Sequence, residues 1–226
     1  TIDGVEVDAE VSLEGTSLTF VTPPGEAGPV DVVVTTVNGA SDPLVFTYID
    51  APVADSLAPV SGPVAGGTVV TIVGENFTPD PVVTIDGVEV PATVNPEGTE
   101  ISFTTPGGEA GPVEVVVTTP GGSTEPLTFT YVDAPLAESL SPVSGPVAGG
   151  TVVTIVGENF TPDSVVTIDG ETVEATVNEA GTELTFTTPA HEAGPVDVVV
   201  STPGGSTEPL TFTYVDAPLA DSLSPV

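Results

Sequence analysis

The sequence contains no lysine and no arginine among its 226 residues. It has 33 aspartate and glutamate residues and a single histidine, which give a formal net charge of −33. Proteins that bind nucleic acids or anionic membranes neutralise phosphate groups with Lys and Arg side chains. The lack of both residues therefore excludes nucleic acids and anionic membrane surfaces as partners.

Cysteine, methionine and tryptophan are also absent. Without cysteine no disulfide can cross-link the fold, and without lysine no isopeptide bond to asparagine can form. No apolar run approaches the roughly 20 residues that a membrane-spanning helix needs. We therefore expect that this segment does not insert into a membrane. Its stability must come from hydrophobic cores and hydrogen bonds.

The composition is nevertheless that of a folded chain. Hydrophobic residues make up 39% of the sequence and the mean hydropathy is +0.33, whereas disordered chains combine high charge with low hydrophobicity. The apolar residues are mostly valine, isoleucine, leucine and alanine in short runs, which is typical of β-strands. The composition predicts an all-β fold.

An internal repeat of 83 residues organises the whole chain. Residues 52–134 and 135–217 are identical at 68 of 83 positions, and Tyr48, Tyr131 and Tyr214 recur at the same spacing. We divide the chain into a first copy (1–50), which lacks the first strands of the repeat, a middle copy (51–133), a last copy (134–216) and the start of a further copy (217–226). We expect the chain to be a window on a longer array.

Alternation of apolar and polar residues predicts strands that bury one side. The apolar sets are Val70 and Ile72, Ile101 and Phe103, Val113, Val115 and Val117, and Leu127, Phe129 and Tyr131. Asp86-Gly87 predicts a two-residue hairpin turn, because both residues tolerate positive φ. We count about seven strands and no helix in a complete copy, which predicts tandem immunoglobulin-like β-sandwiches.

Six motifs of the middle copy recur in the last copy: Ser61-Gly62-Pro63, Gly66-Gly67-Thr68, Val70-Thr71-Ile72, Gly74-Glu75-Asn76-Phe77, Phe103-Thr104-Thr105-Pro106 and Phe129-Thr130-Tyr131. Together they resemble the IPT/TIG family (immunoglobulin-like, plexin, transcription factor). The resemblance implies an early-set immunoglobulin-like fold. The family's functions include receptor ectodomain modules, transcription-factor domains, accessory domains of carbohydrate enzymes and stalks of bacterial surface proteins, and the near-identical tandem copies are similar to the stalk type.

No catalytic or cofactor-binding residue can be assigned from the sequence. A nucleophile needs a neighbouring base, and the only histidine, His191, stands where the middle copy has Gly108. Gly66-Gly67 and Gly121-Gly122 lack the lysine of a phosphate-binding loop, and we interpret them as a strand entry and a hairpin turn. We therefore expect that the chain is not an enzyme.

Acidic pairs at the copy boundaries suggest one hypothesis of metal binding. The pairs are Asp50 and Asp55, Asp133 and Glu138, and Asp216 and Asp221. Ca²⁺ takes oxygen ligands from carboxylates and backbone carbonyls, so these acids could hold calcium between domains. The alternative interpretation, solvated acidic side chains, is favoured because no known calcium-loop signature is present.

The repeat, the charge and the linkers together predict a structural role. Like charges keep neighbouring chains apart, and the proline residues of the short linkers restrict their conformations. We favour a stalk or spacer of an extracellular surface protein or adhesin from a bacterium or archaeon, with neighbouring copies in the same chain as its partners.

Two alternatives remain open. One is a self-assembling extracellular filament or sheath, in which outward residues such as Val69, Val73 and Val116 contact other chains. The other is a carbohydrate-binding module, which the lack of tryptophan and the inward positions of Phe and Tyr disfavour.

Overall fold

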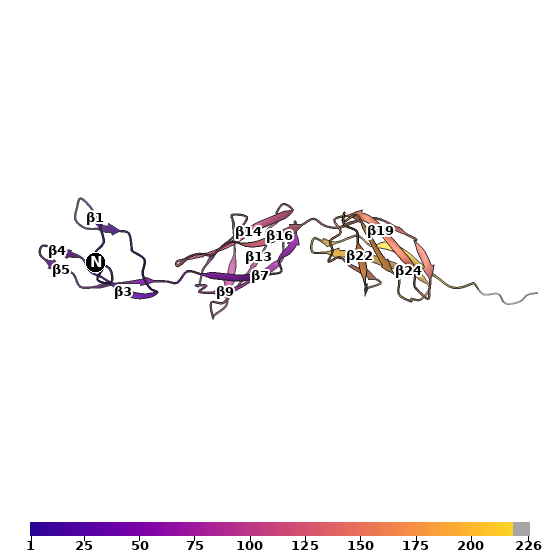
Figure 1. Ribbon diagram of the computed structural model, residues 1–226, viewed down its shortest axis with the longest axis horizontal. Coiled ribbons are helices and arrows are strands. Elements are labelled where there is room, and N and C mark those ends of the chain that lie inside the picture. The colour runs from indigo at the N-terminus through magenta and orange to yellow at the C-terminus, as the bar shows by residue number, and fades with distance from the viewer. Residues whose placement is uncertain (219–226) are drawn as a thin grey trace, which may run out of the picture. The chain divides into compact units, whose positions relative to one another are not determined.

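A computed structural model describes residues 1–218 of the chain. Over these residues the regular secondary structure consists of β-strands alone, which confirms the predicted all-β fold. Accordingly, this part of the chain contains no helix that could cross a membrane. Among residues 1–218, strands pair only with other strands of the same copy of the repeat. Figure 1 labels strands of all three copies and colours them by residue number.

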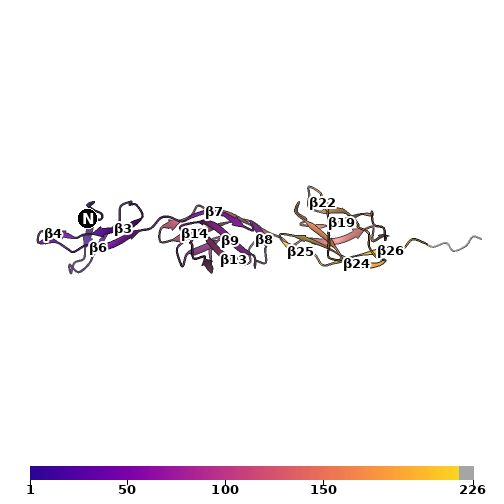
Figure 2. The ribbon, with the colours of Figure 1, turned by 90° about the horizontal axis from the view of Figure 1, so that it is seen from below.

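The last copy is a sandwich of two β-sheets, and Figure 2 shows one sheet with β19 and β22 and, on the opposite side of the copy, the other with β24 and β26. In spatial order the first sheet contains β17 (Leu136–Ser141), β19 (Val152–Glu158), β23 (Glu183–Thr187) and β22 (Ala175–Val177). The second contains β18 (Ser144–Pro146), β26 (Leu210–Val215), β24 (Gly194–Thr202), β20 (Val165–Ile168) and β21 (Glu171–Val173), with β25 (Gly205–Ser206) paired to β24.

Apolar side chains from both sheets meet in the core of the last copy. One sheet contributes residues such as Val153 and Ile155 of β19, and the other contributes Val198 of β24 and Phe212 of β26, all 0% exposed. Complete burial of one such side chain stabilises the fold by about 1.5–3 kcal/mol. Alternation along each strand therefore does what the sequence predicted: it turns one row of side chains toward a shared interior.

The ten strands of the last copy come from seven stretches of chain. Residues 136–146 form β17 and then change sheet to form β18, and residues 171–177 likewise pass from β21 to β22. Residues 205–215 form β25 and, after an interruption, β26. Pro142 lies at the first change of sheet, where its missing N–H ends the ladder with β19. The predicted number of about seven strands thus agrees with the seven stretches of chain, each of which forms one or two strands.

The middle copy has the same two strand orders. One sheet contains β12 (Ala92–Val94), β13 (Glu100–Thr104), β9 (Val69–Glu75) and β7 (Val53–Ala58). The other contains β11 (Val88–Val90), β10 (Val82–Ile85), β14 (Gly111–Thr119), β16 (Leu127–Val132) and β8 (Ser61–Pro63), with β15 (Gly122–Ser123) paired to β14.

Burial in the middle copy confirms the predicted strand faces. Of the predicted inward residues, Val113 and Leu127 are half-buried, and the others are at most 3% exposed: Val70, Ile72, Ile101, Phe103, Val115, Val117, Phe129 and Tyr131. Glu114 and Thr118, which alternate with the buried valines of β14, are exposed. The predicted hairpin turn is also confirmed, because Asp86 and Gly87 have φ values of 51° and 72°.

The first copy contains only the later strands of the repeat. They form three two-stranded sheets: β1 (Ala9–Val11) with β2 (Leu18–Phe20), β3 (Gly28–Val32) with β6 (Leu44–Tyr48), and β4 (Thr35–Thr36) with β5 (Gly39–Ala40). Their register is that of the last copy, since Ala9 pairs with Phe20 as Ala175 pairs with Phe186. Residues 1–50 have no strands corresponding to β17, β18 and β19.

Candidate functional site

The candidate site residues predicted from the sequence lie in or next to the linker that precedes each complete copy. Before the last copy, β16 ends at Val132 and β17 begins at Leu136, so residues 133–135 alone separate the two strands. Residues 49–52 separate β6 from β7 before the middle copy. Both linkers include a buried proline, Pro52 or Pro135. The linkers are therefore short, as the sequence suggested.

An asparagine of the last copy binds the linker that precedes it. Asn159 lies directly after β19 with a φ of 60°, a left-handed conformation that asparagine tolerates better than most residues. Its Nδ2 donates a hydrogen bond to the backbone oxygen of Ala134, at 3.0 Å. In the middle copy Asn76 makes the same bond to the oxygen of Ala51, at 3.2 Å. The side chain thereby fixes the linker backbone at one point.

A glycine provides the second linker contact. Gly204 lies in the turn between β24 and β25, and a Cβ atom at this position would be only 2.0 Å from the backbone oxygen of Asp133. Gly121 has the same relation to Asp50 in the middle copy. No residue other than glycine allows so close an approach of two backbones. We call Asn159 with Gly204, and Asn76 with Gly121, the linker contacts.

The sequence alone did not reveal these linker contacts. Gly121-Gly122 was interpreted as a hairpin turn, and the positive φ of 136° at Gly122 agrees with that role. The turn does not explain why residue 121 is also a glycine, because the φ of Gly121 is not positive. One signal was present in the sequence: the corresponding residue of the first copy is Asn38, so the turn itself does not require glycine there.

The acidic residues proposed for calcium are exposed to solvent. This holds for Asp50, Asp55, Asp133, Glu138 and Asp216, whereas Asp221 lies outside the described residues. Within residues 1–218 no three histidine or acidic residues come together in a group that could hold a metal ion. Backbone carbonyls could still complete a site, so interdomain calcium at these residues stays a prediction.

The lone histidine forms contacts that occur in the last copy only. His191 Nε2 lies 3.3 Å from Oδ2 of Asp169, and its ring stacks on Tyr214 with centroids 5.0 Å apart. The pKa of His191 is raised mainly by the hydrogen bond between its Nδ1 and the backbone oxygen of Glu192. The carboxylate of Asp169 raises it further. In the middle copy Gly108 takes this place, and the ring of Tyr131 lies where a Cβ atom would be.

The tyrosine beside this position has the same hydrogen bond in all three copies. Its hydroxyl donates to the backbone oxygen of Pro23, Pro106 or Pro189, at 2.6, 2.7 and 2.9 Å for Tyr48, Tyr131 and Tyr214. In the last copy, burial raises the pKa of the Tyr214 hydroxyl. The bond joins the last strand to the loop that precedes β3, β14 or β24, and we assign it a structural role.

Strand order and core packing define the complete copies as immunoglobulin-like sandwiches, and the linker contacts define them as members of a tandem array. The IPT/TIG domain model matches residues 1–48, 52–131 and 135–214. The chain therefore belongs to the IPT/TIG family, as the sequence motifs predicted.

Curated relatives include much larger proteins. Fibrocystin-L from Mus musculus is 31% identical over 174 residues, which are 74% of this chain and 4% of the relative. Plexin-A4 from Danio rerio is 31% identical over 186 residues, which are 75% of this chain and 10% of the relative. The chain thus spans only a small part of the relatives that it matches.

Similar solved structures include the extracellular region of a plexin and a protein from a xyloglucan utilization locus. A plexin A4 full extracellular region has a TM-score of 0.48 at 24% identity, over 74% of this chain and 16% of that one. SGBP-B from a xyloglucan utilization locus of Bacteroides uniformis has a TM-score of 0.35 at 30% identity, over 73% of this chain and 49% of that one.

The linker contacts lead to a first testable prediction. We expect Asn159→Ala to speed hydrogen exchange of the backbone amides at the start of β17 by about 2- to 10-fold, the range of one lost hydrogen bond. Gly204→Asn, which introduces the residue of the first copy, should have a larger effect because its Cβ displaces the linker. Asn76→Ala is the matched control, since it removes the equivalent bond from the linker before the middle copy and should leave β17 unchanged. Equal rates in all variants would contradict the contact.

A second prediction concerns pH. Because the folded-state pKa of His191 is raised, its stabilising contribution is complete below the unfolded value of about 6.5 and is lost as the pH rises through the folded value. We expect Asp169→Asn to lower the melting temperature more at pH 5.5 than at pH 8. Asp86→Asn is the matched control, since it removes the same turn carboxylate from a copy without histidine. The same pH dependence in both variants would refute the pairing.

A third prediction separates calcium binding from charge screening. The chain is strongly acidic, so added salt of any kind should raise the melting temperature by screening repulsion. Calcium at the junctions requires a further rise with CaCl₂ over NaCl of equal ionic strength. That excess should decrease in Asp133→Asn/Glu138→Gln, decrease further when Asp50→Asn/Asp55→Asn are added, and remain in the outward control Glu114→Gln/Asp197→Asn. Identical melting curves in CaCl₂ and NaCl of equal ionic strength would contradict calcium binding and would indicate that these acids are solvated side chains.

Proposed function

We propose that the chain is a non-catalytic spacer of a repetitive extracellular surface protein or adhesin from a bacterium or archaeon. In this function each complete copy is a separate domain, with boundaries at residues 51–133 and 134–216. The first copy (1–50) and residues 217–226 belong to further domains of the same kind. Neighbouring copies in the same chain are its partners.

The linker contacts are the observation that carries this proposal. A spacer must resist bending at the points where its domains join, and flexible joints would shorten its reach. In both junctions a short linker is bound by the following copy through one asparagine and one glycine. The recurrence of the same two contacts in both junctions supports a selected mechanical role.

The surface chemistry also supports a spacer. Each complete copy presents carboxylates without any lysine or arginine, so neighbouring chains repel one another at short range. The aromatic side chains of the complete copies are at most 4% exposed. This burial counts against the carbohydrate-binding alternative, because sugars stack on exposed aromatic rings.

One observation favours the filament as a second candidate. Val152 and Val156 on the outer face of β19 are 64% and 38% exposed, and Val69 and Val73 of β9 are 63% and 43% exposed. Such valines would supply apolar contacts between laterally packed chains once salt screens the charge. Val116, in contrast, is only half-exposed.

The spacer function makes a prediction about length. Insertion of one further 83-residue copy should lengthen the particle by a constant increment of roughly 30 Å or more, since the longest strand of a copy has nine residues. Electron microscopy and small-angle scattering of chains with zero, one and two inserted copies measure this increment. Gly204→Asn chains of equal length serve as the control with a loosened linker, and should show a wider spread of end-to-end distances.

Three outcomes would argue against a spacer. Maximum dimensions that do not grow with copy number would exclude the extended array. Lateral association at high salt that Val152→Thr/Val156→Thr abolishes would favour the filament. Saturable binding of xyloglucan or another glycan in a panel would favour the carbohydrate-binding module.

A further inference from the structure

The first stretch of each complete copy pairs with the last strand of the same copy. In the last copy β18 runs parallel to β26, with Ser144 opposite Thr213 and Pro146 opposite Val215. In the middle copy β8 runs parallel to β16 in the same register. We call these two strand pairs, β18 with β26 and β8 with β16, the terminal pairs.

Backbone hydrogen bonds join the strands of a terminal pair at both ends. The amide of Thr213 donates to the oxygen of Val143, at 2.9 Å, and the amide of Val147 donates to the oxygen of Val215, at 3.1 Å. The middle copy has both bonds at the same two distances, from Thr130 to Val60 and from Val64 to Val132. Each terminal pair is therefore bonded over its whole length.

Tension along the chain pulls the two strands of a terminal pair in opposite directions. The linker at residues 133–135 precedes β17 and β18, so it pulls β18 toward its first residue, Ser144. The chain that follows β26 pulls this strand toward its last residue, Val215. Because the strands are parallel, the hydrogen bonds between them are loaded together in shear, and they do not open one after another.

The last copy has a side-chain contact at its terminal pair that the middle copy lacks. The backbone amide of His191, in the loop between β23 and β24, donates to the oxygen of Val147 at 2.9 Å. The ring of His191 stacks on Tyr214 of β26, so this one residue connects the end of β18 to β26. Gly108 of the middle copy donates the same backbone bond to Val64, at 2.9 Å, but it has no ring to stack.

We propose that the terminal pair is the force-bearing element of each complete copy, and that His191 reinforces it in the last copy. Under tension the middle copy then unfolds before the last copy, although the two are identical at 68 of 83 positions. The terminal pair acts by raising the barrier to unfolding, which governs unfolding under force. The biological role of this device rests on the spacer function, since a tethered spacer transmits tension.

Force spectroscopy in two pulling directions tests the terminal pair. The chain contains no cysteine, so two introduced cysteines at exposed residues define the points of attachment. Asp133→Cys with Asp216→Cys shears β18 against β26, whereas Ala148→Cys with Asp216→Cys peels the adjacent ends of the two strands apart. At equal force we expect unfolding of the last copy to be at least about 10-fold slower in shear, because several hydrogen bonds must break together.

A comparison of the two complete copies tests the reinforcement. Asp50→Cys with Asp133→Cys loads the middle copy alone, and at equal force it should unfold about 2- to 10-fold faster than the last copy, the range of one aromatic contact. His191→Gly should speed unfolding of the last copy by the same factor. Ser201→Thr is the matched control, since it also introduces the residue of the middle copy but lies at the end of β24 away from Tyr214.

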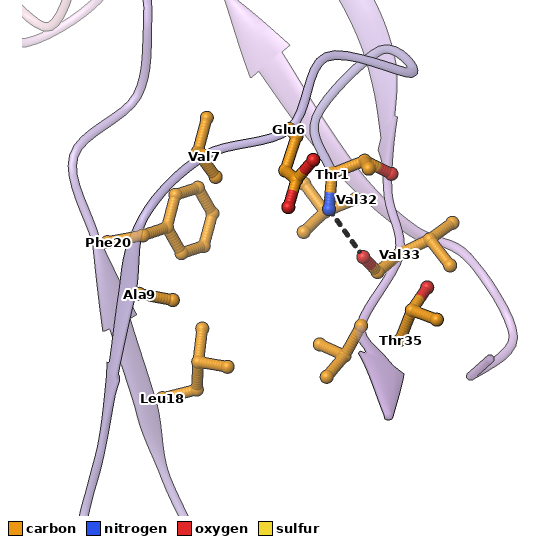
Figure 3. Close-up of a pocket in the computed structure, with 10 residues that line it drawn as sticks. Thr1, Glu6, Val7, Ala9, Leu18, Phe20, Val32, Val33 and Thr35 are labelled. Atoms are coloured by element: carbon orange, nitrogen blue, oxygen red, sulfur yellow. Dashed lines mark hydrogen bonds between the residues drawn. The ribbon is translucent and has the colours of Figure 1, made fainter. Parts of the chain in front are cut away.

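The first copy stays outside all of these pulled segments. Within the described residues its last strand, β6, pairs with β3 only. Figure 3 shows a cavity of about 380 Å³ in this copy, with Leu18 and Phe20 on one wall and Val32 and Val33 on the opposite wall. Extension of residues 1–50 would therefore not report on a terminal pair.

Two results would overturn the proposal. Equal unfolding rates of the last copy in shear and in peeling would show that the terminal pair does not bear the force. Equal rates for His191→Gly and the unchanged last copy would show that the histidine does not reinforce the pair. Neither rate depends on the number of copies, so a failure of the spacer function in the length series is distinguishable from both results.

Discussion

The contact between β19 and the opposite sheet is the interaction on which the complete fold depends. Val153 and Ile155 of β19 lie between Leu184 and Phe186 of the neighbouring strand and Phe212 of the other sheet, in one core cluster. In the first copy, which has no counterpart of β19, residues of the same type lose their cover and Phe46 becomes 37% exposed. The later strands nevertheless keep their register.

Alternation in the sequence predicted this core because each strand obeys one rule. A strand with two different faces can place only one of them inward, so Val115 and Val117 had to share the interior that Glu114 avoids. The turns followed from equally local chemistry, since Asp86-Gly87 needs nothing beyond positive φ at two positions. The division of seven stretches into ten strands was not predictable in the same way, because a change of sheet depends on which neighbour remains unpaired.

The linker contacts show where sequence reasoning ended. The acidic pairs at the boundaries attracted attention because carboxylates suggest metal chemistry, yet the five of these side chains that lie within residues 1–218 are exposed to solvent. The residues that bind the linker, Asn159 and Gly204, resemble an ordinary cap and an ordinary turn. What distinguishes Gly204 is the backbone oxygen of Asp133 at the place of its missing Cβ. The linker backbone requires glycine at position 204, and a requirement of this kind leaves no pattern in the neighbouring sequence. The only indication in the sequence was Asn38, which occupies the corresponding position of the first copy.

The differences between the middle and last copies show which constraint acts on the repeat. Of the 15 positions that differ between residues 52–134 and 135–217, one is buried, and there Ile101 is replaced by Leu184 at nearly unchanged volume. The other differences lie on exposed or half-buried positions, and none of them introduces lysine or arginine. Between these two copies the differences are therefore confined almost entirely to the surface, whereas the interior changes at one position and the charge keeps its sign.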